Sequence, residues 1–116
     1  MSVQRLLTEK RHSEIVIHNG TVYLAGQLAD DHSGDIAAQT RETLASTDRM
    51  LAEAGSDKSK ILSVTIYLKE LARDYAGFNQ VWDAWVAPGA APARACVEAA
   101  MYKPEVLVEI TVVAAL

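Results

Sequence analysis

Cysteine is almost absent from this 116-residue sequence, which contains only Cys96. A lone thiol cannot form an internal disulfide bond, so we expect a reducing compartment, the cytoplasm, and a free thiol. Long apolar runs are also lacking, because no stretch reaches the roughly 18 apolar residues of a membrane span. Residues 1–10 contain neither the apolar core nor the cleavage site of a signal peptide. The sequence therefore predicts a cytoplasmic protein without a membrane partner.

Positive charge is scarce as well. The 11 Lys and Arg residues are outnumbered by 15 Asp and Glu, which gives a net charge of −4 at pH 7. Because phosphate binding needs a net basic patch, we expect no nucleic-acid partner. The sequence has no CxxC or HExxH motif and its three histidines are not clustered, so it predicts no metal site. Residues 30–34 combine two aspartates with a histidine, but their composition favours a solvated turn.

The patterning that is present indicates one α+β domain over residues 1–116. Half of the residues are apolar, which is enough to bury a single core. The expected elements follow in the order ββαβαββ, and a further short strand around residues 3–7 is compatible with the pattern. The strands are expected at residues 13–18, 21–25, 61–68, 94–100 and 107–115, and the helices at 35–54 and 74–86.

Local signals define several of these boundaries. Asn19-Gly20 is typical of a two-residue type I′ hairpin turn. Asp35 is expected to cap the first helix, and Gly55 is expected to end it. Alternation along residues 61–68 predicts that one set of side chains packs under the helices. That set is Leu62, Val64, Ile66 and Leu68.

The second helix carries an aromatic stripe. Large aromatic side chains usually pack in the core, so we expect this stripe to be buried. It consists of Tyr75, Phe78, Trp82, Trp85 and Val86. Asn79 lies on the same face, and leaving its amide unsatisfied would cost about 1–3 kcal/mol. Asn79 therefore either caps a neighbouring loop or reaches into a pocket.

Two helices cover one face of a sheet of this size. The other face is left bare, and many of its residues are small or apolar. An uncovered face of that kind predicts an interface. A closed homo-oligomer is the usual way to cover it.

The candidate site centres on Arg94, which shares one side of its strand with Cys96 and Glu98. A guanidinium binds a carboxylate through paired hydrogen bonds, and Glu109 can position a water or pass a proton. Backbone amides near Gly26 and Cys96 can complete an anion site. The alternative is a structural ion pair of Arg94 with Glu98 or Glu109. Cys96 is expected to be a small packed residue and not a nucleophile, because no cation-rich setting or histidine base is evident for it.

Several segments resemble the RidA family, also called YjgF/YER057c/UK114. The resemblance extends from about Ser13 to the C-terminus, and its Pro-Ala-Arg-x-x-Val-Glu signature is fairly specific. The segments are 21–27 (TVYLAGQ), 35–40 (DIAAQT), 51–55 (LAEAG), 75–79 (YAGFN) with Trp82, 92–98 (PARACVE) and 108–110 (VEI).

The resemblance implies a chorismate-mutase-like α+β fold, with two helices on one face of a mixed sheet, and a homotrimer with clefts between subunits. It implies hydrolysis of enamines and imines such as 2-aminoacrylate to 2-keto acids and ammonia, without metal or organic cofactor. The enzyme type is a 2-iminobutanoate/2-iminopropanoate deaminase. By the resemblance Arg94 grips the substrate carboxylate, Glu109 orients water, Cys96 offers its backbone amide, and Asn79 and Gly26 line the cleft.

The sequence departs from the family pattern in three places. His12 or Ser13 stands where many members have a tyrosine, Ala25 replaces a serine, and the loop before Pro92 is shorter. These differences concern the range of substrates. His12 either serves in place of the tyrosine or is an exposed residue near a terminus.

Two other functions remain open alongside the deaminase. One is a non-catalytic module that binds small carboxylic acids in the same clefts. The other is the translation-inhibitor or L-PSP endoribonuclease activity that is also attached to this family. The acidic net charge argues against ribonuclease activity.

Overall fold

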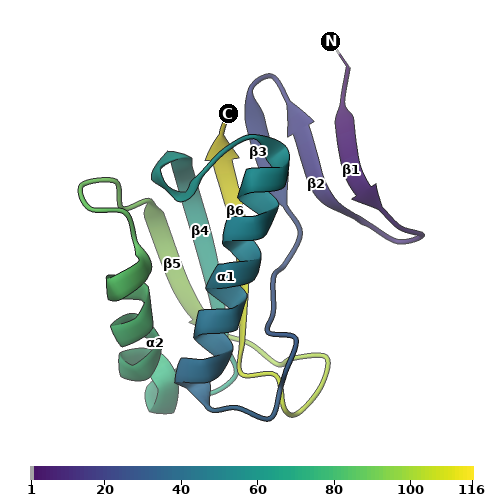
Figure 1. Ribbon diagram of the computed structural model, residues 1–116. Coiled ribbons are helices and arrows are strands. Elements are labelled where there is room, and N and C mark those ends of the chain that lie inside the picture. The colour runs from purple at the N-terminus through teal and green to yellow at the C-terminus, as the bar shows by residue number, and fades with distance from the viewer. Residues whose placement is uncertain (1) are drawn as a thin grey trace.

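The computed structural model describes residues 2–116. They form one six-stranded sheet of order β1-β2-β3-β6-β4-β5, and both helices lie on the same face of it (Figure 1). β4 and β5 run parallel, whereas the other neighbouring strands run antiparallel. The expected α+β architecture with a mixed sheet is thus confirmed. The elements are β1 (Gln4–Thr8), β2 (Ser13–His18), β3 (Thr21–Leu24), α1 (Ile36–Ala54), the short 3₁₀ helix η1 (Lys58–Lys60), β4 (Ile61–Leu68), α2 (Leu71–Trp85), β5 (Ala93–Glu98) and β6 (Val108–Ala115).

The expected order ββαβαββ is found from β2 onward. β1 comes before it, at the place where the sequence pattern allowed a further short strand around residues 3–7. β1 pairs with β2 alone, and four of its five residues are exposed. Only Leu6 of this edge strand packs against the core, so the strand shows no apolar alternation and its signal is weak. In Figure 1 the β1–β2 ribbon extends away from the helices.

The local turn and cap signals are confirmed. Asn19 and Gly20 have φ values of 52° and 75°, as a type I′ turn requires. The Asp35 carboxylate accepts a hydrogen bond from the Ala38 amide at 3.0 Å, at the start of α1. Gly55 ends α1 in the left-handed region at φ 86°.

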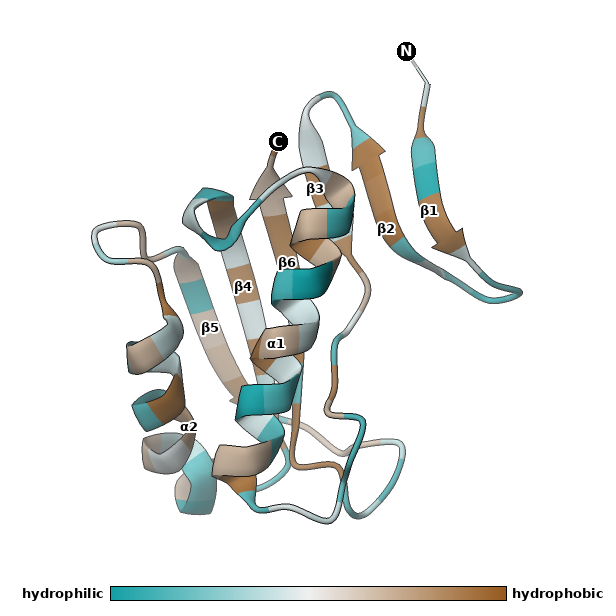
Figure 2. Cartoon of the chain, in the orientation of Figure 1, coloured by the Kyte–Doolittle hydropathy of each residue, from teal (hydrophilic) through white to brown (hydrophobic). Residues whose placement is uncertain are grey.

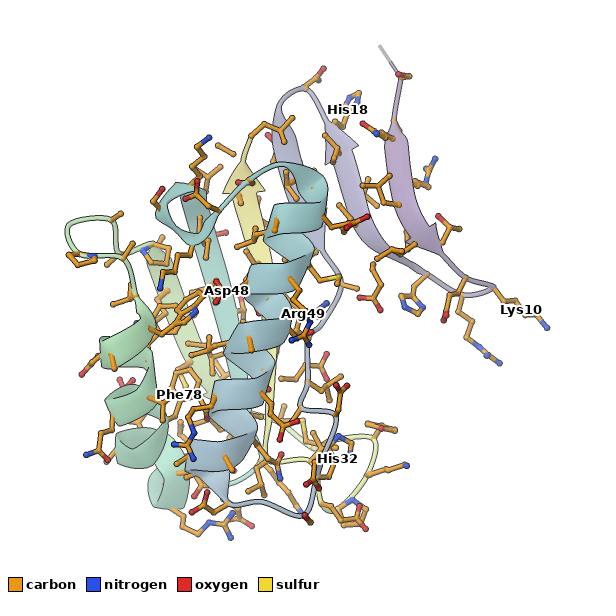
Figure 3. All side chains as sticks on the ribbon, viewed as in Figure 1. Lys10, His18, His32, Asp48, Arg49 and Phe78 are labelled. Carbon is orange, nitrogen blue, oxygen red and sulfur yellow. The ribbon has the colours of Figure 1, made fainter. Side chains whose placement is uncertain are left out.

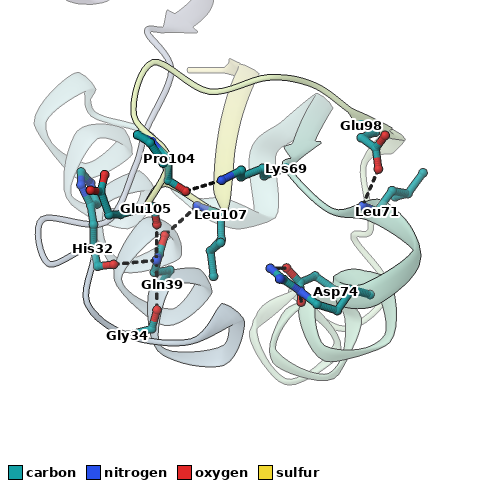
Figure 4. Close-up of polar contacts among 11 residues, drawn as sticks. His32, Gly34, Gln39, Lys69, Leu71, Asp74, Glu98, Pro104, Glu105 and Leu107 are labelled. Carbon is teal, nitrogen blue, oxygen red and sulfur yellow. Dashed lines mark hydrogen bonds and ion pairs between the residues drawn. The ribbon is translucent and has the colours of Figure 1, made fainter.

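Helix α2 begins at Leu71, one turn earlier than expected. Glu98 at the end of β5 accepts a hydrogen bond from the Leu71 amide at 3.0 Å (Figure 4). This carboxylate caps the helix from a distant part of the chain, so no local signal marks the start. The aromatic stripe is only partly buried, because Phe78 and Trp82 lie in the core whereas Tyr75 is 45% exposed.

The prediction that Leu62 packs under the helices is wrong. Two steps along β4, from Ile61 to Ser63, match a single step along β6. Leu62 is the extra residue of this bulge and is 52% exposed, while Ile61 takes the buried position. The other three side chains of the expected set, Val64, Ile66 and Leu68, are buried as predicted.

The hydrophobic core lies between the helices and one sheet face. Alternate residues of β4 and β6 point into it and meet Leu44 and Leu51 of α1 and Phe78 of α2. Hydrophobic and paler segments accordingly alternate along β4 in Figure 2. The two helices described within residues 2–116 are both too short or too polar to cross a membrane.

Candidate functional site

Arg94 lies on the edge strand β5, directly opposite Val64 of β4. Because aligned residues of neighbouring strands share a sheet face, its side chain lies on the helix-covered face. One guanidinium nitrogen, Nη2, donates a hydrogen bond to the Asn79 amide oxygen at 2.8 Å. The guanidinium carbon lies 5.4 to 6.0 Å from the ring centroids of Trp82, Phe78 and Tyr75. Aromatic faces and one amide thus hold the cation in place.

No carboxylate pairs with this guanidinium within residues 2–116. The two ion pairs of that part of the chain join His12 to Glu14 and Arg73 to Asp74. The alternative of a structural ion pair of Arg94 is therefore wrong for the single chain. An arginine stays charged at any relevant pH, so a half-buried guanidinium with only neutral partners attracts an anion.

Asn79 is the residue that orients Arg94. Its side-chain oxygen binds Arg94 and does not cap a loop, and the expected reach into a pocket stays a prediction. Its Oδ1 accepts the hydrogen bond from Arg94, which satisfies the amide that the sequence left without a partner. This hydrogen bond holds the Arg94 guanidinium against helix α2.

Cys96 lies two residues after Arg94 on the same sheet face, opposite Ile66. The thiol packs against the core, and this burial raises the pKa of Cys96, although the nearby Arg94 charge opposes the rise. A thiol with a raised pKa stays neutral near pH 7 and is a poor nucleophile. Cys96 also borders a hollow of about 450 Å³ whose other lining residues are Leu71, Ala72 and Tyr75.

Glu109 lies on the opposite face of the sheet from Arg94. It is aligned with Tyr67 of β4, whereas Arg94 is aligned with Val64. Its carboxylate sits over Gly26, where an added Cβ would overlap the carboxylate oxygen. Glu109 also borders a hollow of about 300 Å³ on this face. Ala25, next to Gly26, accepts a hydrogen bond from the Gln27 side chain through its carbonyl oxygen at 3.0 Å.

The expected site residues therefore form two separate groups in one chain. Arg94, Asn79 and Cys96 are together on the helix-covered face, and Glu109 and Gly26 are together near the other. The sheet itself separates the Arg94 guanidinium from the Glu109 carboxylate, because alternation directs the two side chains to opposite sides. A single chain does not bring Glu109 beside Arg94.

His12 belongs to neither group. It lies between β1 and β2, and its Nε2 is 3.2 Å from a carboxylate oxygen of Glu14. β1 and β2 lie at one end of the strand order and β5 at the other. Figure 3 labels Lys10, which is two residues before His12, and Phe78, whose ring lies next to Arg94. The two labelled residues lie at opposite ends of the molecule. His12 can meet an Arg94 only in another copy.

Gln39 is a buried residue whose role the sequence analysis missed. Its Nε2 lies 2.9 to 3.2 Å from the carbonyl oxygens of His32, Gly34 and Glu105, which share its two hydrogens. Its Oε1 accepts a hydrogen bond from the Leu107 amide at 3.0 Å (Figure 4). One side chain of α1 thereby holds two loops, one of which leads into β6. Its place within the 35–40 segment of the resemblance was the only available signal.

The Asp30–Gly34 segment forms the turn that was expected. The Asp31 carboxylate accepts hydrogen bonds from the Ser33 amide at 2.9 Å and the Ser33 hydroxyl at 2.7 Å. The His32 ring packs edge-on against the Tyr102 ring, with 6.3 Å between the two ring centroids. Among the described residues no three His, Cys, Asp or Glu side chains lie close enough to hold a metal ion.

Comparisons with known proteins agree over nearly the whole length of the chain. A family model described as Endoribonuclease L-PSP matches residues 2–116. A RutC family protein of Haemophilus ducreyi is 44% identical over 114 residues, covering 98% of this chain and 97% of that protein. The RutC family protein YoaB of Escherichia coli is 44% identical over 115 residues, or 99% of each protein.

Solved structures show the same fold. A protein from Pseudomonas aeruginosa has a TM-score of 0.94 at 49% identity and covers 98% of both chains. A member of the YjgF protein family from Neisseria meningitidis has a TM-score of 0.95 at 47% identity, covering 99% of this chain and 95% of that one. Because the family model spans residues 2–116 and these relatives share almost half of its residues, this chain belongs to the RidA (YjgF/YER057c/UK114) family.

Proposed function

We propose that this protein hydrolyses reactive enamines and imines of small 2-amino acids, such as 2-aminoacrylate, to 2-keto acids and ammonia in the cytoplasm. The observation that carries the proposal is Arg94, a fixed guanidinium without a carboxylate partner in residues 2–116. A flat fork of donors of this kind matches the carboxylate of a 2-imino acid. Holding that group fixes the pose of the adjacent imine carbon.

The reaction needs only modest help from the protein because an imine carbon is already electrophilic. An enamine such as 2-aminoacrylate first gains a proton at its terminal carbon and loses one from nitrogen, which gives the imine. A water then adds to the imine carbon while one of its protons passes to the nitrogen. The hydroxyl proton of the resulting carbinolamine follows to the nitrogen as ammonia leaves and the keto group forms. Glu109 accepts the proton of the water and returns it to the departing nitrogen. Cys96 takes part through its backbone amide and not through its neutral thiol.

The site requires two copies of the chain. Because Arg94 and Glu109 lie on opposite sheet faces, one copy supplies Arg94, Asn79 and Cys96, and its neighbour supplies Gly26 and Glu109. Ala25 and His12 come from the neighbour too. A homotrimer, with one cleft between each pair of subunits, is the assembly we expect. The open sheet face supports this expectation, because the exposed apolar side chains of Tyr23, Leu62 and Val97 would be covered by another copy.

The primary test measures keto-acid and ammonia release. A pyridoxal-phosphate lyase acting on serine supplies 2-aminoacrylate, and release is compared with and without this protein. Arg94→Ala is expected to lower kcat/KM by about 100-fold or more, because the substrate loses its anchor. Arg94→Lys keeps the charge but not the paired hydrogen bonds and should recover only part of the rate. No acceleration by the wild type would refute the proposal.

Mixed assemblies test whether two copies share each site. Arg94→Ala and Glu109→Gln are expected to be inactive alone. When the two variants are co-expressed in equal amounts, about one quarter of the clefts combine an intact arginine with an intact glutamate. Recovery of about that fraction of the wild-type rate supports a shared site, whereas no recovery would refute it.

The description of the matching family model as an endoribonuclease motivates a second assay, RNA cleavage. We expect none, because the net charge of −4 opposes binding to a phosphate backbone. Cleavage that survives Arg94→Ala would identify a separate ribonuclease function.

A further inference from the structure

We propose that the hollow lined by Leu71, Ala72, Tyr75 and Cys96 receives the substrate side chain and favours imines whose side chain is uncharged, apolar and larger than methyl. This specificity pocket rests on the proposed function, since it lies beside the guanidinium that is expected to hold the carboxylate.

Tyr75 connects the two parts of the site. Its hydroxyl lies 3.4 Å from Nη2 of Arg94, and its ring forms one wall of the hollow. Cys96, which forms another wall, is two residues from Arg94 on the same face, a separation of about 6.6 Å along a strand. Because the Tyr75 hydroxyl lies beside the guanidinium and the Tyr75 ring lines the hollow, the hollow and the guanidinium are adjacent. A substrate anchored on Arg94 therefore has its side chain at the mouth of the hollow.

The lining of the hollow determines which side chains suit it. Leu71, Ala72 and the Tyr75 ring are apolar, Cys96 is a neutral thiol, and no charged side chain is among the lining residues. Glu98, whose carboxylate binds the Leu71 amide, lies next to the lining and disfavours a second carboxylate on the substrate. An acidic side chain is thus excluded by charge, and an apolar one gains by leaving water.

The hollow, of about 450 Å³, is shallow and open to solvent, and it has room for a side chain larger than methyl. Each further methylene that a substrate buries there is expected to raise kcat/KM by roughly fourfold. Imines derived from leucine or phenylalanine should therefore be turned over with higher kcat/KM than the imine derived from alanine.

The test uses imines made by an amino-acid oxidase from alanine, 2-aminobutyrate, leucine, phenylalanine and glutamate. Wild type is compared with Ala72→Leu, which fills the hollow from an exposed helix position where leucine is a good helix former. The ratio of kcat/KM for the leucine-derived to the alanine-derived imine should fall at least about tenfold in this variant. Ala84→Leu makes the same change on α2 but in the groove that faces α1, and should leave the ratio unchanged.

Binding of the corresponding 2-keto acids, measured by calorimetry, gives a second readout. Affinity should rise from pyruvate to 4-methyl-2-oxopentanoate in the wild type, and Ala72→Leu should abolish that rise. If imines are hydrolysed but neither rate nor affinity depends on side-chain size, the specificity pocket is overturned and the proposed function stands. If affinity follows size as expected but no imine is hydrolysed, the pocket stands and the proposed deaminase is refuted.

Discussion

The two faces of the sheet differ in how much of the candidate site a single chain supplies. On the helix-covered face, one chain supplies both Arg94 and the groups that hold it, Asn79 and three aromatic rings. On the open face, Glu109 lies over Gly26, and Tyr23, Leu62 and Val97 are exposed. The first face presents a finished half of a site, whereas the second needs another molecule to cover it.

The contrast explains why catalytic residues can be distant within one chain. Arg94 on β5 and Glu109 on β6 are separated by β4 and point to opposite faces of the sheet, so they cannot meet without a second copy. Association then has two effects at once, since it buries the apolar open face and brings the two halves together. Changes to the exposed apolar side chains of the open face should therefore act on assembly and activity together, whereas changes near Arg94 or at Glu109 should act on activity alone.

The largest effect is expected from a charge on the open face. Val97→Glu places a carboxylate where we expect apolar contact with another copy, and it should dissociate the oligomer and abolish activity. Analytical ultracentrifugation checks the assembly state. The matched variant Val97→Thr keeps the shape of the side chain and should remain associated. An oligomer that tolerates the glutamate would mean that copies meet elsewhere.

A smaller effect is expected where Gly26 supports Glu109. In Gly26→Ala the added Cβ overlaps the Glu109 carboxylate and displaces it, which should lower kcat by about 10- to 100-fold with little change in assembly. Gly89→Ala is the control, because its φ of 73° makes alanine strained there while no atom lies within 4 Å. The control should lose about 1 kcal/mol of stability and no activity. Equal activity losses in both variants would contradict the role of Gly26.

The loops behind the site depend on Gln39. Gln39→Leu removes hydrogen bonds to three carbonyl oxygens and one amide in a buried position, so the free energy of unfolding should fall by about 2–4 kcal/mol. Urea denaturation monitored by tryptophan fluorescence measures the change. Gln80→Leu, on the exposed side of α2, should stay within about 0.5 kcal/mol of the wild type. A loss as large in the control would point to a general effect of removing surface amides.

The smallest expected effect concerns Cys96. Because burial raises the pKa of its thiol, alkylation by iodoacetamide should reach half its maximal rate at a higher pH in the folded protein than in urea. A raised folded pKa also means that the contribution of this group to stability is present below the unfolded pKa and is lost as the pH rises through the folded value. Cys96→Ala should keep most of the activity. A midpoint below that of the unfolded chain would instead indicate an activated thiol.

Much of the fold was readable from short-range patterns. The Asn19-Gly20 turn, the Asp35 cap and the Gly55 end of α1 each depend on residues within one or two turns of chain. The start of α2 was missed because its cap is Glu98, more than twenty residues away. Leu62 was misassigned because a bulge arises from the pairing of β4 with β6 and leaves no mark in β4 alone.

The candidate residues follow the same division. The sequence by itself determined that Arg94, Asn79, Cys96, Gly26 and Glu109 are the groups to examine, since side-chain chemistry and family pattern belong to the chain. Only the tertiary structure decided that Arg94 has no carboxylate partner among residues 2–116 and that Glu109 lies on the other face. The physical reason is that charge and hydrogen-bonding capacity are properties of single residues, whereas facing and burial depend on strand register and on which strands become neighbours.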